Sequence, residues 1–429
     1  MKILIVGNGI AGNEVATVLR KRNSEHSITL LSKERVPEYD PCTLTYFVSG
    51  DVPRDVVFRR KFEDYERARV QFVPESTAVG VDTTAKCLLV ENGTTYRYDT
   101  LVLAYGAEPS IPPIQGTDRD GVFCCKELND ADRLFRHRGE NAVVIGSGAV
   151  GVEAAEALKK RGYAVTLIEL LDWILPTMFD EKAGRLLETA MEGYGIRVLA
   201  GEEVQSLEGT TSVAGVITNK RRIPCDTVVF GTGMDIDVSL PVTAGIEVNK
   251  GVVVNEYMQT SMADVYACGD CAETRDFLSG QPCTHKQKHN AIDQARIVAR
   301  NILSDGVAYP GSYSFARVHF FDTYAATFGH TEQTLSCSDN VEIIERQDGS
   351  NYLKILLNEG RILGAQATGV YADQIGWIMG AAWRKDDIFK LQQEWEHICR
   401  IASPYPWAFR KMGEILGLPQ PEDSVLSFP

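Results

Sequence analysis

The chain has 429 residues, of which 44% are hydrophobic and 24% charged, as is typical of a globular protein with two or three domains. Its formal net charge of −14 argues against nucleic acid and anionic membranes as partners, because both would repel it. The first residues suggest a buried strand rather than a signal peptide, and no apolar run approaches the ~20 residues of a membrane span, so we expect a cytoplasmic protein whose cysteines are free thiols.

The chain opens with "KILIVGNGIAGNEVATVLRKR", a short β run followed by Gly7, Gly9 and Gly12 and then an amphipathic helix. In this pattern the first glycine permits a tight turn, the second lets the backbone approach a pyrophosphate, and the third lets helix and strand pack closely. The free N–H groups of the helix then face the phosphates. The next β run ends at Ser32, where an acidic residue would contact a ribose, so either Ser32 or Glu34 remains a candidate for that contact.

A single cysteine, Cys42, follows in the stretch "PEYDPCTLTYFVSG". Asp40 as N-cap, Pro41 as first helical residue and Gly50 as C-cap predict a short helix with Cys42 in its first turn. The positive end of that helix favours the thiolate, whereas the neighbouring Asp40 raises the pKa of the thiol. Two interpretations stay open: a redox-active thiol, or a small residue that lines a cofactor pocket.

The glycine pattern recurs in "NAVVIGSGAVGVEAAEALKKRGYAVTLIEL", which contains Gly146, Gly148 and Gly151 and a second β run that ends at Glu169. A carboxylate at that position accepts hydrogen bonds from both ribose hydroxyls of an adenosine. It would also repel a 2′-phosphate. This half of the chain is therefore expected to prefer NADH over NADPH.

Three further segments carry a family resemblance: residues 100–113 ("TLVLAYGAEPSIPP"), 227–237 ("TVVFGTGMDID") and 263–273 ("ADVYACGDCAE"). The first two resemble the crossover segments of the pyridine nucleotide–disulfide oxidoreductase family, with Tyr105 in place of the usual threonine. The third resembles the segment whose aspartate holds the flavin ribityl chain. Together with both glycine patterns, the resemblance covers residues 1 to about 300.

The resemblance implies an α/β fold with two Rossmann-like nucleotide-binding domains and a C-terminal α+β interface domain. FAD would occupy a discontinuous domain of residues 1–112 and 241–308, and NADH an inserted domain of residues 113–240. The interface domain with a helical tail would be residues 309–429. The protein would be an FAD flavoprotein that accepts hydride from NADH and passes electrons to a second acceptor, with Asp270 on the ribityl chain.

The candidate cofactor contacts from these motifs and from the resemblance form one set of residues. They are Gly7, Gly9, Ile10, Ala11, Gly12, Ser32, Glu34, Cys42, Ala104, Gly106, Gly146, Gly148, Val150, Gly151, Glu169, Gly233, Gly269 and Asp270.

A metal site is the alternative interpretation of the "CGDC" stretch from Cys268 to Cys271, which is followed by Cys283, His285 and His289. No second CxxC completes a four-ligand site, and the aspartate inside the stretch is assigned to the flavin. We therefore expect no metal, and we interpret Cys268 and Cys271 as packing residues.

Disulfide-reducing members of the family carry two cysteines five positions apart. At that spacing from the lone thiol this chain has Pro37 and Phe47, which excludes a dithiol mechanism through this segment. In the single-cysteine branch, which contains coenzyme A disulfide reductases, persulfide reductases and NADH oxidases or peroxidases, the thiol begins a Cys-Gly-x-Pro-Tyr segment that residues 42–46 resemble in part. The oxidases and peroxidases carry a histidine where this chain has Ile10, which argues against reduction of oxygen or peroxide to water.

The chain also resembles a second branch of the family. That branch contains rubredoxin and ferredoxin reductases and the flavin domains of nitrite reductases, which pass electrons to a protein metal centre without a catalytic thiol. We favour this branch: an NADH:acceptor oxidoreductase with an iron–sulfur or rubredoxin-like partner, either as a homo-oligomer or as a subunit of a larger complex. The alternative is an NADH-dependent coenzyme A disulfide or persulfide reductase with Cys42 as its catalytic thiol. A flavin-bound subunit without catalysis is a minor alternative.

From about Tyr309, short alternating runs with glycine turns predict an antiparallel sheet, followed by a helical segment from about Ala372. Four of the five tryptophans lie in this last stretch, and we expect them to pack within the domain or across a homodimer rather than to form a docking surface. They are Trp377, Trp383, Trp395 and Trp407.

Overall fold

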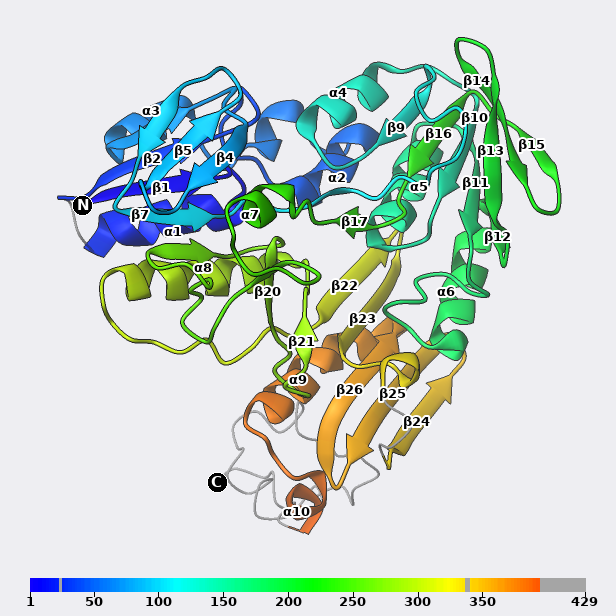
Figure 1. Ribbon diagram of the computed structural model, residues 1–429. Helices are drawn as coiled ribbons and strands as arrows, with labels where there is room; N and C mark the ends of the chain where they lie inside the picture. The colour runs from blue at the N-terminus through cyan, green and yellow to red at the C-terminus, as the bar shows by residue number, and fades with distance from the viewer. Residues whose placement is uncertain (23–24, 336–339, 394–429) are drawn as a thin grey trace, which may run out of the picture. The chain divides into compact units, whose positions relative to one another are not determined.

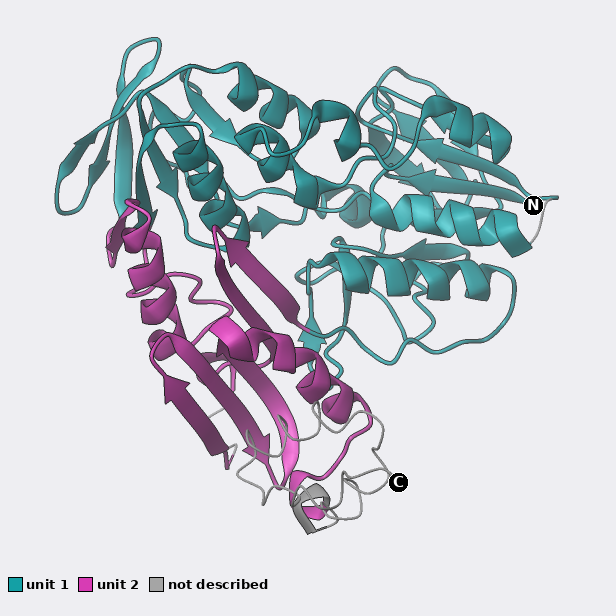
Figure 2. Ribbon diagram, turned by 180° about the vertical axis from the view of Figure 1, so that it is seen from behind, with its two compact units in different colours: residues 1–168, 203–313 teal, residues 169–202, 314–429 magenta. Residues whose placement is uncertain are grey.

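The computed structural model describes residues 1–22, 25–335 and 340–393. The chain forms two compact units, the first of residues 1–168 and 203–313, and the second of residues 169–202 and those from 314 onward (Figure 2). In the part of the chain that the structure describes, no helix is both long enough and apolar enough to cross a bilayer.

The first unit contains a five-stranded parallel sheet with the strand order β19-β7-β1-β2-β3 (Figure 1). Its strands are β1 (Lys2–Val6), β2 (Ser27–Leu31), β3 (Val70–Val73), β7 (Thr100–Leu103) and β19 (Val265–Ala267). Strand β7 is buried along its whole length and β1 beyond its first residue, which fits the unbroken apolar runs of central parallel strands. In the register of the sheet, Ile5 lies between Leu30 and Val102, so the carboxyl ends of these strands meet at one edge.

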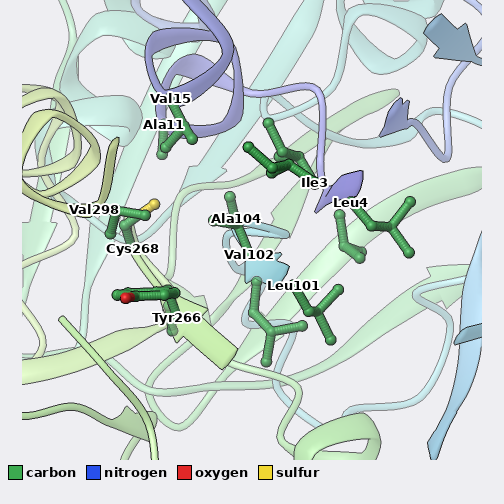
Figure 3. Packing of buried hydrophobic residues seen from close by; sticks show 14 of the residues in the cluster. Ile3, Leu4, Ala11, Val15, Leu101, Val102, Ala104, Tyr266, Cys268 and Val298 are labelled. Carbon is green, nitrogen blue, oxygen red and sulfur yellow. The ribbon is translucent and has the colours of Figure 1, made fainter. Parts of the chain in front are cut away.

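Helices α1 (Ile10–Arg22) and α8 (Lys288–Ile302) pack against each other beside this sheet. Val15 of α1 and Val298 of α8 are both fully buried, together with the apolar side chains of β1, β7 and β19. Figure 3 shows part of this core. These side chains belong to one continuous hydrophobic core, whose burial stabilises this half of the unit.

A second parallel sheet contains β11, β10, β16 and β9 in that order. Its strands are β9 (Val122–Cys124), β10 (Asn141–Ile145), β11 (Ala164–Glu169) and β16 (Thr227–Phe230). Helix α4 (Leu128–Arg136) follows β9, and helix α5 (Ala149–Lys160) follows β10. In the register, Ile145 pairs with Ile168 and with Phe230, so the carboxyl ends of the strands again meet at one edge.

The two crossover segments noted in the sequence, residues 100–113 and 227–237, pair with each other in a short two-stranded ribbon. Strand β8 (Glu108–Pro109) comes after β7, and strand β17 (Met234–Asp235) comes after β16; the two pair antiparallel. The other strands of the unit are β4 (Ala78–Asp82), β5 (Cys87–Val90), β6 (Thr95–Arg97), β13 (Val204–Gly209), β14 (Val213–Thr218), β15 (Arg222–Pro224), β18 (Val252–Val253), β20 (Ala272–Arg275) and β21 (Pro282–Cys283). Its short helices are η1 (Pro41–Thr43), α2 (Leu44–Ser49), η2 (Arg54–Val57), α3 (Phe62–Arg67) and α7 (Ser239–Thr243).

The second unit is built on an antiparallel five-stranded sheet, as the alternating runs predicted, with the order β22-β23-β26-β25-β24. Its strands are β22 (Phe315–Phe320), β23 (Thr323–Gly329), β24 (Glu342–Asp348), β25 (Asn351–Asn358) and β26 (Arg361–Thr368). The unit also contains α6 (Glu181–Gly193), β12 (Arg197–Ala200), η3 (Glu332–Thr334), η4 (Gly369–Gln374), α9 (Ile375–Trp383) and α10 (Ile388–Gln393).

The helical segment predicted from Ala372 is present as η4, α9 and α10. Trp377 is 44% exposed on α9, whereas Trp383 is half-buried, so of the two expected packing modes only packing across a homodimer would cover Trp377 fully. Trp395 and Trp407 lie outside the described residues.

A buried ion pair holds the start of α6 to the sheet of the second unit. The Nζ of Lys354, on β25, lies 2.8 Å from Oδ2 of Asp180 and 2.9 Å from Oε1 of Glu332. The side-chain amide of Gln366 also donates to Asp180 and accepts from the backbone N–H of Asp180 at 2.8 Å. Lys354 and Asp180 are both only 5% exposed; the charge of Asp180 is compensated by Lys354, and the charge of Lys354 by the two carboxylates.

Candidate functional site

The first glycine motif, here called the first cradle, consists of Gly7, Gly9 and Gly12 between β1 and α1. A Cβ atom on Gly7 would lie 2.2 Å from the carbonyl oxygen of Ala104, and one on Gly12 would lie 2.0 Å from the carbonyl oxygen of Gly7. The packing of the chain itself therefore requires glycine at these two positions. At Gly9, no atom of the described residues would lie within 4 Å of a Cβ, so packing against the described part of the chain does not require glycine at this position.

The second cradle, Gly146, Gly148 and Gly151 between β10 and α5, has the same construction. A Cβ on Gly151 would lie 1.9 Å from the carbonyl oxygen of Gly146, and one on Gly146 would lie 2.6 Å from that of Gly231. At Gly148 the nearest atom would be 3.7 Å away, an ordinary contact. In both cradles the outer glycines serve packing, while the middle glycine leaves space in which a phosphate could approach.

The side chains at the cradle helices differ in exposure. In the first cradle, Ile10 is half-buried and Ala11 is buried at the start of α1. Val150, at the corresponding place on α5, is exposed.

Other sequence-predicted residues gather at the carboxyl edge of the first parallel sheet. Ser32 directly follows β2, Ala104 and Gly106 follow β7, and Gly269 and Asp270 follow β19. Because these strands are parallel neighbours of β1, their following residues lie on the same edge as the first cradle. This is the edge at which open α/β sheets bind their ligands.

Two polar side chains at this edge lack protein partners within the described residues. The carboxylate of Asp270 makes no hydrogen bond or ion pair there; burial raises its pKa, and Lys126 and Lys286 act in the opposite direction. The hydroxyl of Tyr105, in the crossover after β7, is buried without a hydrogen-bond partner. Buried polar groups are normally satisfied, so the buried hydroxyl of Tyr105 fits a polar ligand at this edge, and the half-buried carboxylate of Asp270 can accept hydrogen bonds from one.

The ribose contact left open by the sequence concerns Ser32 and Glu34. The hydroxyl of Ser32 is buried and donates to the backbone carbonyl of Glu34 at 2.8 Å. The carboxylate of Glu34 is half-buried and, among the described residues, accepts a single hydrogen bond, from the hydroxyl of Tyr39 at 2.8 Å. Glu34 therefore has acceptor capacity to spare, whereas the only donor of Ser32 is already used.

At the second sheet, Glu169 is the last residue of β11, and Gly233 follows β16. Glu169 is 8% exposed, and its carboxylate accepts a hydrogen bond from the backbone N–H of Leu171 at 2.9 Å. Gly233 is exposed and has a φ of 103°, which disfavours any other residue.

The segment that carries Cys42 begins and ends as predicted. Asp40 is the N-cap and accepts a hydrogen bond from the backbone N–H of Cys42 at 3.2 Å, and Gly50 ends α2 with a φ of 87°. The predicted single helix is instead the 3-10 turn η1 followed by α2. Lys288, the first residue of α8, forms an ion pair with Asp40.

Of the two opposing effects named for Cys42, the one that raises the pKa of the thiol is the larger. Although the residue is exposed, desolvation of its sulfur by the surrounding atoms and the carboxylate of Asp40 raise the pKa of the thiol to about 11, while Lys288 lowers it. A three-residue 3-10 turn provides too short a row of peptide dipoles to overcome these two effects. Near pH 7 the thiol of Cys42 is therefore protonated.

The sequence did not point to Glu153, which lies in the second turn of α5, two residues after Gly151 of the second cradle. Its carboxylate accepts a hydrogen bond from Thr45 of α2 at 3.1 Å, and Lys160 of α5 forms an ion pair with Asp51 at 2.9 Å. The first contact joins α2 to α5, and the second joins α5 to the segment that follows α2. A carboxylate beside the apolar face of a cradle helix is visible in the sequence, but its hydrogen-bond partner Thr45 is 108 positions away and could not be predicted.

Burial raises the pKa of Glu153 to about 7, with the hydrogen bond from Thr45 acting against the shift. The folded protein therefore binds more protons than the unfolded chain between about pH 4.5 and 7, and this carboxyl makes stability fall as pH rises through that window. Glu153→Gln, which cannot ionise, should match the wild type at pH 4.5 and exceed its stability at pH 8 by at most about 3 kcal/mol. Urea denaturation of both proteins at the two pH values measures this; a parallel loss in both proteins would contradict it.

The cysteines of the "CGDC" stretch are packing residues, as predicted. Cys268 and Cys271 are fully buried, and the thiol of Cys271 donates to the backbone carbonyl of Leu103 at 3.5 Å. The eight cysteines within the described residues are all free thiols.

Two parallel sheets, each with a glycine cradle at its carboxyl edge, define a protein that binds two nucleotides. Comparison with protein-family models narrows the class: the model described as "Pyridine nucleotide-disulphide oxidoreductase" matches residues 1–295. The chain belongs to this family. It is an FAD-dependent NAD(P)H oxidoreductase, which confirms the predicted family, fold class, cofactors and enzyme class.

Three relatives share sequence with most of the chain. An NADH oxidase from Methanocaldococcus jannaschii is 34% identical over 70% of this chain and 70% of its own length. A subunit epsilon of NADH-dependent phenylglyoxylate dehydrogenase from Aromatoleum evansii is 29% identical over 87% of this chain and 89% of its own length. A rubredoxin-NAD(+) reductase from Pseudomonas putida is 30% identical over 72% of this chain and 82% of its own length.

The fold extends beyond the matched family region. An NAD-dependent persulfide reductase from A. fulgidus has a solved structure that superposes with a TM-score of 0.87, at 28% identity, over 92% of this chain and 79% of its own. The relatives differ in the acceptors that their names give, so similarity identifies an NADH:acceptor oxidoreductase without identifying the acceptor.

Proposed function

We propose that this chain passes electrons from NADH, through FAD, to a protein that carries an iron–sulfur or rubredoxin-like centre. The binding of two nucleotides is supported by the middle glycines of the two cradles, Gly9 and Gly148. Each lies at the carboxyl edge of its own parallel sheet and leaves space for a phosphate. FAD supplies a ring that accepts a hydride and releases electrons one or two at a time. The residues of the chain bind and orient the two nucleotides and limit access to them.

The first cradle would hold the FAD pyrophosphate, and the unpartnered Asp270 the ribityl hydroxyls. Glu34 is preferred over Ser32 for the adenosine ribose, because its carboxylate keeps free acceptor sites. The second cradle and Glu169 would hold NADH.

These assignments keep the domain limits expected from the sequence: residues 1–112 and 241–308 for FAD, 113–240 for NADH, and 309–429 for the interface domain. The free cysteines support a reducing compartment and so a cytoplasmic location.

A protein acceptor is favoured by two observations. The raised pKa of the Cys42 thiol disfavours the thiolate near neutral pH, which would make the residue a poor nucleophile toward a disulfide or persulfide. Two relatives are, by name, a subunit of a larger dehydrogenase and a rubredoxin reductase. Assembly with a redox protein, as a homo-oligomer or within a larger complex, follows from this proposal.

The experiment is to purify the tagged protein from its native host, identify the redox protein that accompanies it, and measure NADH-driven reduction of that protein. Cys42→Ser should retain this rate within about twofold, because an exposed group outside the electron path contributes little. Loss of partner reduction in the serine variant, or failure of every accompanying redox protein to be reduced, would count against a protein acceptor.

The second candidate is thiol chemistry at Cys42, favoured by its exposure and by the likeness to a persulfide reductase. Anaerobic titration with NADH distinguishes the two, because a functional sulfenate or mixed disulfide takes up two electrons beyond those the flavin needs. An equal electron count for wild type and Cys42→Ser removes this candidate. Rapid bleaching of the flavin by NADH would likewise remove the minor candidate, a subunit without catalysis.

Substitution of Glu169 tests the NADH assignment. Glu169→Ala should lose the ribose hydrogen bonds and the repulsion of a 2′-phosphate, so the NADH:NADPH ratio of kcat/KM should fall roughly ten- to a hundredfold. Steady-state kinetics with both nucleotides measures this. A wild-type enzyme that already prefers NADPH would contradict the role given to this residue.

A further inference from the structure

The hairpin of β20 and β21 brings together three side chains of metal-ligating type. Asp276 directly follows β20, Cys283 ends β21, and His285 comes two positions later. Thr274 pairs with Cys283 across the hairpin, which places the residues after β20 and at the end of β21 side by side. One carboxylate oxygen, the thiol sulfur and one imidazole nitrogen all lie within 4.8 Å of one another.

Asp276 is buried, with 5% of its surface exposed, and hydrogen bonds hold its carboxylate in a fixed orientation. Its Oδ1 accepts hydrogen bonds from the backbone N–H groups of Leu278 at 3.0 Å and Ser279 at 2.7 Å, and from the hydroxyl of Ser279 at 2.9 Å. Its Oδ2 lies 2.9 Å from Nε2 of His285. One oxygen is thus occupied by the loop, and the other is directed at the imidazole.

The cluster differs from the metal set that the sequence suggested. Cys268 and Cys271 are buried packing residues, and His289 has its Nε2 3.1 Å from the backbone carbonyl of Tyr313. None of the three belongs to the cluster, and Asp276, which no sequence motif marked, completes it. The half-buried Cys283 and His285 leave one side open to solvent.

We propose that Asp276, Cys283 and His285 form a site for one divalent transition-metal ion of the zinc type, with solvent as the fourth ligand. A thiolate, an imidazole and a carboxylate are the donors that zinc takes in proteins, and three protein ligands with one open position are typical of its non-structural sites. The thiol and the imidazole select against magnesium and calcium, which prefer oxygen ligands. The ion would tie the hairpin to the segment that enters α8.

The test uses the FAD-loaded protein, stripped of metal with a chelator and titrated with zinc against a chromophoric competitor. One zinc per chain should bind, and X-ray absorption should show one sulfur at about 2.3 Å and nitrogen or oxygen at about 2.0–2.1 Å. Cys283→Ser and His285→Gln should each weaken zinc binding roughly tenfold or more. The matched control is Cys87→Ser, which removes a half-buried thiol on β5 and should bind zinc as the wild type does.

Flavin content and the thermal midpoint of each metal-free variant, compared with the metal-free wild type, separate loss of a ligand from loss of the fold. If Cys283→Ser does not fold, the zinc affinity of His285→Gln alone decides the test. The site is overturned if the wild type binds no stoichiometric zinc, or if the Cys283 and His285 variants keep wild-type affinity. Loss of binding in Cys42→Ser with retention in these variants would also overturn it.

Discussion

Gly12→Ala is expected to yield protein that no longer retains FAD and is less stable than the wild type by about 3 kcal/mol or more. The added Cβ would lie 2.0 Å from the carbonyl oxygen of Gly7 and 3.2 Å from the side chain of Ile5. Backbone atoms cannot rotate away as a side chain can, so α1 must move off β1 and the cradle opens. Flavin content from the visible spectrum and the thermal midpoint measure the two effects.

Gly9→Ala provides the contrast within the same loop. Because no atom of the described residues lies within 4 Å of a Cβ there, the chain should fold with wild-type stability yet lose most of its FAD, since the proposed cofactor would meet the methyl group. Gly148→Ala should retain FAD and raise the KM for NADH. Gly376→Ala on α9, where no described residue would lie within 4 Å of the added Cβ, is the control; it should leave FAD binding unchanged and stabilise the protein by up to about 1 kcal/mol. Full FAD retention in Gly9→Ala would contradict the assignment of the first cradle.

The cradles could be predicted from the sequence because their requirements are local. Gly12 must be glycine because of Gly7, a few positions earlier on the same strand–turn–helix unit, and the apolar runs on either side indicate buried parallel strands. The antiparallel sheet of the second unit was equally visible, because alternation along a strand records which face is buried.

The polar clusters could not be predicted, because each joins residues from separate elements. Thr45 meets Glu153, and Asp276 meets His285, only after the sheets and hairpins have formed. At Cys42 the sequence showed the caps of the helix and the opposing effect of Asp40 but not the enclosure of the sulfur, so the net direction of the pKa shift of the thiol stayed open. Burial of a charge is a tertiary property that local pattern does not contain.

Lys354→Met is expected to destabilise the second unit by about 3–5 kcal/mol. Methionine fits the volume of the lysine stem but leaves the carboxylate of Asp180, which is 5% exposed, without its cation. The amide of Gln366 still donates to that carboxylate but cannot neutralise it. All five tryptophans belong to residues 169–202 and 314–429, so urea unfolding followed by tryptophan fluorescence reports on this unit.

The double variant Lys354→Met, Asp180→Asn separates loss of a contact from burial of an unpaired charge. Removing both charges should recover most of the lost stability, because a buried ion pair often contributes little net free energy compared with neutral groups of similar volume. Lys182→Met, which breaks the exposed pair with Glu345, is the matched control and should cost at most about 1 kcal/mol. If the double variant is as unstable as Lys354→Met alone, the cost lies in packing around the lysine stem and not in the charge of Asp180.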